Sequence, residues 1–124
     1  MRLTYAGKYP YVLESPSKEV MEIWQKKKKI IAELSVIPLG LGPSVSRYVK
    51  EAIRELKSSN IRFELSAMGT VLEADNIDAL FEAVKMAHEA VFKAGALRVV
   101  TTLKIDDRRD KALSIESKLK AIKS

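Results

Sequence analysis

The stretch Thr70–Asp110 decides the fold of this chain, and it reads TVLEADNIDALFEAVKMAHEAVFKAGALRVVTTLKIDDRRD. It predicts a strand over 70–74, a helix over 77–94 and a strand over 97–105, followed by a charged turn. Asp75 or Asn76 is expected to cap the helix, and Gly95 to end it at a position where glycine is favoured. The helix has an apolar stripe at helical spacing, formed by Ile77, Leu80, Phe81, Val84, Ala87, His88, Val91 and Phe92.

The segment before this stretch repeats the same strand–helix–strand pattern. A strand is expected over 30–37, IIAELSVI, and Pro38 closes it. Ser44 is the expected N-cap of a helix that continues to about residue 58. A strand over 61–67 follows, and Met68-Gly69 then marks a tight turn or bulge, where glycine permits a positive φ.

Two such units in tandem predict an α+β fold of the ferredoxin-like βαββαβ type. Right-handed crossovers applied twice give a four-stranded antiparallel sheet with both helices on one face. The other face is expected to be bare and half-polar, and such a face marks a ligand platform or an oligomer interface. We place on it Ile31, Glu33, Ser35, Ile37, Glu64, Ser66, Thr70, Thr102 and Lys104. The predicted organisation is an N-terminal extension at 1–28 and one domain at 29–124, which ends in a short helix over 114–122.

Composition and charge exclude several classes of protein. The 124 residues include no Cys and one His, which excludes thiolate chemistry and argues against a transition-metal site. Residues 1–29 hold seven Lys/Arg against three Asp/Glu, whereas 30–124 hold 15 against 13, so the predicted domain is nearly neutral. A basic balance carried by one arm is weak support for nucleic-acid binding. No apolar run reaches the about 18 residues of a membrane span, so we expect a cytoplasmic protein without membrane partners.

Four blocks of the sequence together resemble a known family. They are IIAELSVIPLG, PSVSRYVKEAI, ELSAMGTVLEA and FEAVKMAHEAVFKAGALRVVTTLKIDDRRD, in this order between about residues 30 and 110. They resemble the small YkoF-like thiamine-binding protein family, of ferredoxin-like fold. The resemblance implies a non-enzymatic binder of thiamine or its hydroxymethylpyrimidine moiety that forms homodimers or homotetramers. The extension at 1–28 lies outside the family's pattern.

Several residues have the chemistry that such a ligand requires. A thiazolium cation calls for a carboxylate or an aromatic face, and an aminopyrimidine edge for hydroxyl, amide or carboxylate groups. The candidate ligand-binding residues are Glu33, Ser35, Ser44, Ser46, Met68, Gly69 and Thr70. Structural explanations stay open for them: an exposed or oligomer-paired Glu33, a capping Ser44, and a bulge at 68–70.

Other conspicuous residues have structural interpretations. We expect Glu73 to be a solvated charge and His88 to be a hydrogen-bonded histidine of the core or of an interface. Asp106-Asp107-Arg108-Arg109-Asp110 is expected to be an ion-paired turn at a subunit contact. We predict no metal site and no cofactor.

Four functions compete for this sequence. The first is small-molecule binding, and its alternative is a structural or regulatory homo-oligomer without a ligand. Nucleic-acid binding on the sheet requires stacking aromatic side chains, and the strands 30–37 and 97–105 have none. An acylphosphatase-like enzyme would need an Arg in the first loop, and 38–43 contains none. We therefore expect no catalytic residues.

Overall fold

The computed structural model describes residues 3–4, 12–13, 17–19 and 29–123. The sequence also predicts a short helix over 18–28 that Ser17 could cap, and most of these residues lie outside the described ones. The elements are β1 (Leu3–Thr4), β2 (Val12–Leu13), β3 (Ile30–Pro38), α2 (Ser46–Ser58), β4 (Arg62–Leu65), β5 (Thr70–Ala74), α3 (Ile77–Lys93), β6 (Val99–Asp106) and α4 (Ile115–Lys123). β1 and β2 form an antiparallel pair of their own.

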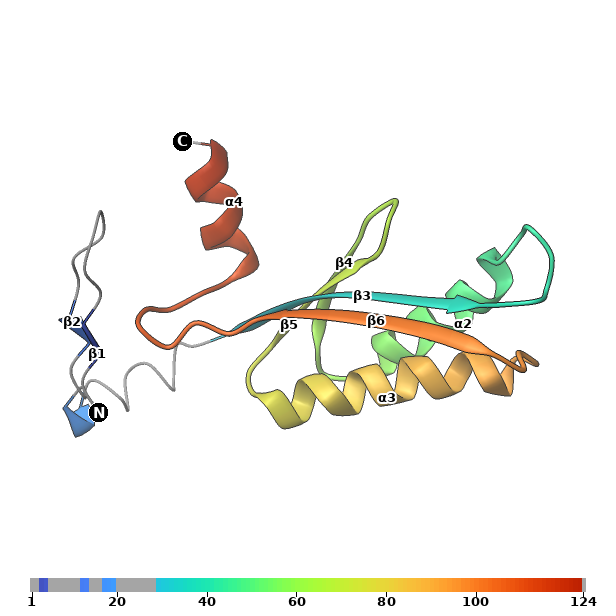
Figure 1. Ribbon diagram of the computed structural model, residues 1–124, viewed down its shortest axis with the longest axis horizontal. Helices are drawn as coiled ribbons and strands as arrows, with labels where there is room; N and C mark the ends of the chain where they lie inside the picture. The colour runs from blue at the N-terminus through green and yellow to red at the C-terminus, as the bar shows by residue number, and fades with distance from the viewer. Residues whose placement is uncertain (1–2, 5–11, 14–16, 20–28, 124) are drawn as a thin grey trace.

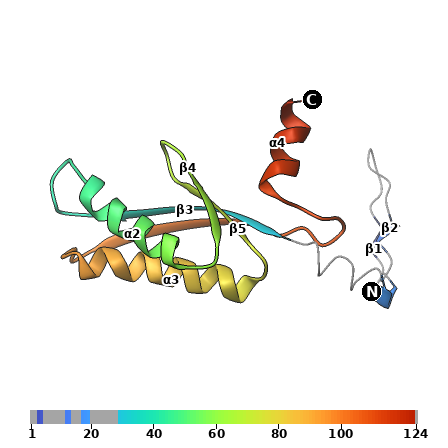
Figure 2. The ribbon, with the colours of Figure 1, turned by 180° about the vertical axis from the view of Figure 1, so that it is seen from behind.

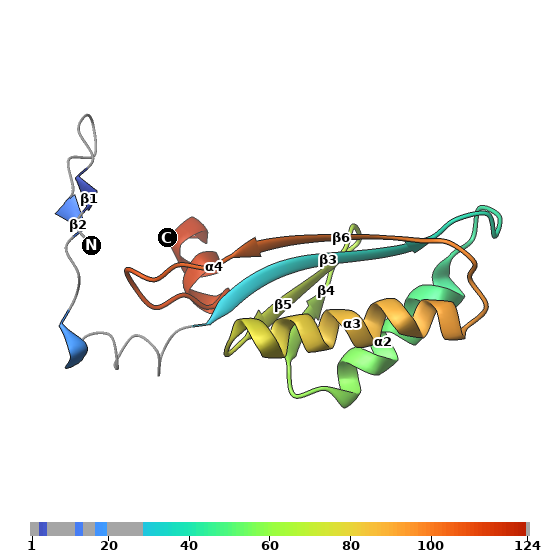
Figure 3. The same cartoon turned by 60° about the horizontal axis from the view of Figure 1, so that its bottom comes forward.

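The other four strands form the predicted antiparallel sheet, in the order β4-β5-β3-β6. α2 and α3 lie side by side on one face of this sheet (Figures 1 and 3). The ferredoxin-like fold predicted from the two tandem units is therefore confirmed. β3 is the central strand with the longest ladder, because it pairs with β6 from Ile31 to Pro38.

The sheet face under the helices holds the core. Side chains alternate along a strand, so every second residue of β3 points to the helices and is buried there. These residues pack with β5, α2 and α3 into one cluster: Ile30, Ala32, Leu34, Val36, Ala52, Leu56, Ile61, Leu72, Ala74, Leu80, Ala83, Ala87, Val91 and Ala96. Of the apolar stripe predicted for α3, Leu80, Ala87 and Val91 are buried in this core, whereas Phe81 is 51% exposed.

The ends of the two long helices differ in how they are capped. The Asn76 side chain accepts a hydrogen bond of 2.8 Å from the Ala79 N–H, and Gly95 has a φ of +117°, so both ends of α3 follow the prediction. The expected Ser44 cap is wrong. α2 begins at Ser46 after Val45, and no side chain caps it.

The expectation of a bare second sheet face is wrong at one end of the sheet. α4 lies on that face, opposite α2 and α3 (Figures 1 and 2). Leu113 and Ile115 pack there against Ile31, with Val71 beside them. The charged turn at 106–110 reverses the chain after β6 and so brings this apolar pair back onto the sheet. The face beyond Val71 stays open.

Candidate functional site

The hollow that gathers most of the predicted ligand residues lies where β5 separates from β3. The β3–β5 ladder ends at Leu34 and Thr70, although β3 continues to Pro38. The β4–β5 hairpin extends past the end of this ladder through its turn at 66–69. Its tip points away from the layer formed by α2 and α3 (Figures 1 and 2). We call the resulting space the hairpin cleft. Its volume is about 290 Å³, and it is lined by Leu34, Ser35, Val36, Ile37, Val49, Ala52, Ile53, Leu56, Leu65, Ser66, Ala67, Met68, Gly69 and Thr70.

The structure brings five of the seven candidate residues together. Ser35, Met68, Gly69 and Thr70 line the hairpin cleft. The Glu33 side chain lies beside Gly69, at the edge of the cleft on the open sheet face. Ser44 and Ser46, at the start of α2, do not line the cleft.

Thr70 lies on the side of the sheet opposite to our expectation. It stands next to Leu34 in register, so it faces the helices, and it is 9% exposed. Its place in the cleft follows from its position at the end of the ladder.

Gly69 is required for space and not for a left-handed backbone. The positive φ that glycine permits is not used at this position, since among the described glycines a positive φ occurs at 40, 42 and 95. A Cβ on Gly69 would lie 3.1 Å from the Leu34 carbonyl oxygen and 3.4 Å from Glu33 Cγ. Ser66 closes the turn, because both its N–H and its hydroxyl donate to the Gly69 carbonyl, at 2.9 and 2.8 Å. The end of the turn, at Gly69, thus lies tightly against β3.

Glu33 is the carboxylate available to a cation at this cleft. Across the open face, Lys104, Glu33, Val71 and Glu64 form one row in register. Glu64 forms an ion pair of 3.0 Å with Arg62. In the part of the chain that the structure describes, no ion pair involves Glu33, and its side chain is exposed.

The α2 wall of the cleft was missed from the sequence as part of the site. The sequence places Val49, Ala52, Ile53 and Leu56 on one apolar stripe of this helix, and Ala52 and Leu56 are indeed buried. Val49 and Ile53 are only half-buried, because the hairpin tip does not close over them. No sequence signal separates these two residues from the core.

Glu73 is not the solvated charge that we expected. Its carboxylate is 9% exposed, accepts a 2.9 Å hydrogen bond from the Ile115 N–H and lies 3.8 Å from the Arg62 guanidinium. Arg62 also pairs with Glu116 in the first turn of α4, and this contact raises the pKa of Arg62 and lowers that of Glu116. A carboxylate at a helix N-terminus is favourable. The pair Arg62–Glu73 therefore anchors α4 to the open face.

Replacing Glu73 with Gln is expected to release α4 from the sheet about tenfold more often, because a hydrogen bond to a charged group contributes about 1.5–3 kcal/mol. The measurement is the rate of tryptic cleavage at Lys118 and Lys120, followed by mass spectrometry. Glu64→Gln is the matched control, since Glu64 pairs with Arg62 without contacting Ile115. Equal cleavage rates in the two variants would refute the anchoring role.

The remaining conspicuous residues have structural partners. His88 Nδ1 lies 2.6 Å from Thr101 Oγ1, and its ring stacks edge-on with Phe92, so the prediction of a hydrogen-bonded histidine is confirmed. In the charged turn Arg109 pairs with Asp107, and Arg108 pairs with Asp110 and lowers the pKa of that carboxyl. The predicted ion pairing of this turn is confirmed, and its place at a subunit contact stays a prediction.

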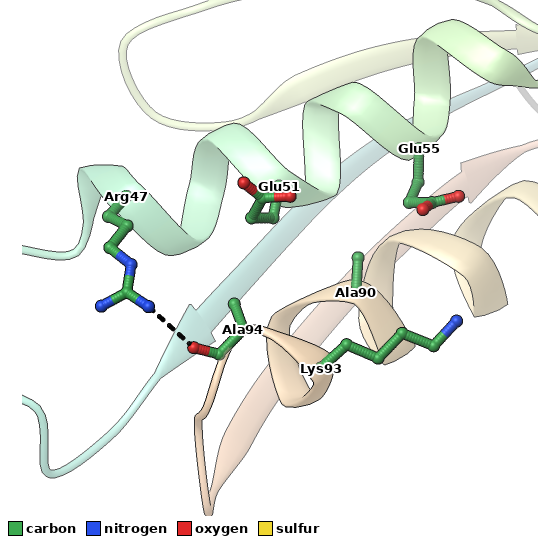
Figure 4. Close-up of a pocket in the computed structure, with 6 residues that line it drawn as sticks. All are labelled: Arg47, Glu51, Glu55, Ala90, Lys93 and Ala94. Atoms are coloured by element: carbon green, nitrogen blue, oxygen red, sulfur yellow. Dashed lines mark hydrogen bonds between the residues drawn. The ribbon is translucent and has the colours of Figure 1, made fainter.

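A second hollow, of about 300 Å³, lies between α2 and α3 and has a different character. Figure 4 shows Arg47 reaching across it to the Ala94 carbonyl, at 3.2 Å, while Glu51 and Glu55 project from α2 and Lys93 extends along α3. A guanidinium at the last carbonyls of a helix satisfies an otherwise unpaired acceptor. This groove therefore joins two helices by a polar contact, and it lacks the apolar walls of the hairpin cleft.

Among the residues that the structure describes, no group of three or more His, Cys, Asp or Glu side chains is arranged to hold a metal ion. Within the same residues, no helix is long and apolar enough to cross a membrane.

The fold and the cleft define a ferredoxin-like protein with a small-molecule-sized hollow at a split in its sheet. The chain belongs to the Thiamine-binding protein family, whose model matches residues 32–123. This membership supports a role in binding a small molecule.

Relatives from archaea and bacteria agree with this membership. A UPF0045 protein of Methanothermobacter thermautotrophicus is 56% identical over 95 residues, which cover 76% of this chain and 96% of the relative. The crystal structure of a hypothetical protein of Methanocaldococcus jannaschii has a TM-score of 0.72 at 51% identity, covering 77% of this chain and 97% of that one. A domain of unknown function from Bacillus cereus has a TM-score of 0.68 at 33% identity, covering 77% and 90%.

Proposed function

We propose that this chain binds thiamine or its hydroxymethylpyrimidine moiety in the hairpin cleft and does not transform it. Family membership supports the class of ligand. The observation that carries the proposal is the cleft itself, which has an apolar wall from α2 and an exposed carboxylate, Glu33, at its edge. A flat ring against aliphatic side chains and a cation beside a carboxylate are the two contacts that thiamine requires.

The size of the cleft indicates how such a ligand would sit. Small-molecule sites usually have volumes of about 300–1,000 Å³, and the hairpin cleft is at the low end. It suits one ring of thiamine, with the other ring at the mouth. Met68 is 88% exposed at the hairpin tip, and its flexible thioether can fold over a bound ring.

We also propose that the protein acts in the cytoplasm as a homodimer or homotetramer. On the open face Ile37 and Val100 are neighbours in register, and each is 44% exposed. The outer edge of β6 has no partner among the described strands. Exposed strand edges and apolar sheet surface favour pairing with another chain. These features also support the second candidate function, a structural homo-oligomer without a small ligand.

Calorimetric titration of the full chain with thiamine, and separately with hydroxymethylpyrimidine, tests the proposal. We expect saturable heat and a ligand-dependent rise in the melting temperature, since a ligand that binds the folded state alone stabilises it. Absence of heat at millimolar ligand would refute the binding function. Light scattering with a melting temperature that depends on protein concentration, but not on ligand, would favour the structural oligomer.

A further inference from the structure

The free edge of β3 inside the hairpin cleft has the hydrogen-bonding groups of an incomplete sheet. Beyond Leu34, β3 has a ladder with β6 on one side and, among the described strands, no partner on the other. The residues concerned are 35–38. Four consecutive residues, 34–37, line the cleft. Successive side chains of a strand point to opposite faces of the sheet, so a hollow on one face would contact only every second residue. Because all four residues line the cleft, the cleft lies along the edge of β3.

The direction of each peptide group follows from one hydrogen bond. Leu39 N–H donates to the Arg98 carbonyl at 2.9 Å, toward the β6 side. Peptide groups along an antiparallel strand alternate in direction, so Ile37 and Ser35 also point to β6. The N–H and C=O of Val36 therefore point to the free edge. Pro38 is the next residue whose backbone faces the free edge. Because this edge has no partner strand, the N–H that proline lacks is not needed for a ladder hydrogen bond.

Val36 thus offers a parallel N–H donor and C=O acceptor to the cleft. No described side chain forms a hydrogen bond to either group, and the turn at 66–69 bonds to itself through Ser66 and Gly69. In a complete sheet, one residue of a neighbouring strand would accept from this N–H and donate to this C=O. Unpaired peptide groups in a partly apolar hollow favour a ligand that restores both bonds.

We propose that the pyrimidine ring of the ligand enters the cleft and pairs with Val36 as a strand residue would. The proposal rests on the proposed binding function, and it explains how the site would select an aminopyrimidine. The ring nitrogen accepts from the Val36 N–H, and the adjacent exocyclic amine donates to the Val36 C=O. Val49 and Ile53 pack against one face of the ring. The cationic ring of thiamine then lies at the mouth, toward Glu33.

This arrangement discriminates by the order of donor and acceptor. In the oxo analogue, the amine is replaced by a carbonyl oxygen and the ring nitrogen carries a proton. Both groups then face a like partner on Val36, so two hydrogen bonds are lost and two peptide groups stay unpaired. The expected loss of affinity is about a hundredfold or more.

The test compares hydroxymethylpyrimidine with its oxo analogue on the full chain, by calorimetry and by spectra of ¹⁵N-valine-labelled protein. We expect the amino compound to bind at least about a hundredfold more tightly and to shift the Val36 amide resonance strongly. The Val91 amide, inside α3, is the internal reference. No variant is needed, so a folding defect cannot obscure the result.

Each outcome separates the two proposals. Equal affinity for the two pyrimidines, or tight binding with an unchanged Val36 resonance, overturns the pairing and leaves the binding function intact. If neither thiamine nor either pyrimidine binds, the binding function fails, and the pairing fails with it.

Discussion

Replacing Leu80 with alanine is expected to lower the free energy of unfolding by about 3 kcal/mol. Leu80 is fully buried in the core between α3 and the sheet. Alanine suits a helix, so the loss comes from the removed apolar contacts and from the cavity that they leave. Denaturant titration measures the change directly. The melting temperature should fall by about 4–8 °C for each kcal/mol.

Leu97→Ala is the matched control for this variant. It deletes the same atoms from a side chain that is 93% exposed in the loop after α3. Its effect on stability should stay within about 0.5 kcal/mol. Similar losses in the two variants would mean that the packing of α3 on the sheet is not the source of stability.

Replacing Glu33 with Gln is expected to weaken thiamine binding about tenfold and to leave binding of the neutral hydroxymethylpyrimidine unchanged. The side chain keeps its shape and loses the charge that faces the cation. A charge pair at about 4 Å contributes from about 1 kcal/mol in bulk water to about 4 kcal/mol near a protein surface, and tenfold corresponds to about 1.4 kcal/mol. Because Glu33 is exposed, added salt should reduce the difference in thiamine affinity between the wild type and the variant.

Glu64→Gln is the control for Glu33→Gln, since both residues lie on the open face beside Val71 and Glu64 already pairs with Arg62. Calorimetry on both variants with both ligands gives the comparison. An equal loss for the charged and the neutral ligand would show that Glu33 shapes the cleft and does not attract the cation. An equal loss of thiamine affinity in both variants would mean that the summed charge of the open sheet face, and not Glu33 in particular, attracts the cation.

The order of helices and strands could be predicted from the sequence, because capping residues, turns and apolar spacing along 30–110 all favour the observed topology. Asn76 and Gly95 mark the ends of α3, and the alternation in β3 separates the buried from the open face. Ser44 shows the limit of such signals. A good capping residue stands two positions before the helix, and the helix nevertheless begins at Ser46, after Val45, without a side-chain cap.

The candidate site was predictable in part. The ligand that the family resemblance implies pointed to Glu33, Ser35 and the turn at Met68-Gly69, which the hairpin cleft brings together. The α2 wall escaped because a half-buried Ile53 has the same sequence pattern as a core residue. The role of Glu73 depends on a contact with Ile115, 42 residues later, that no local pattern encodes.

β3 takes part in two structures at once, since its alternate side chains form the core while its free edge lines the cleft. Mutations that retune ligand preference through this strand therefore also disturb folding. Evolutionary change in preference has more freedom at the exposed tip, 65–68, and on the outward residues of α2. We expect the sequences of relatives that bind different ligands to differ mainly at these positions and to differ less in β3.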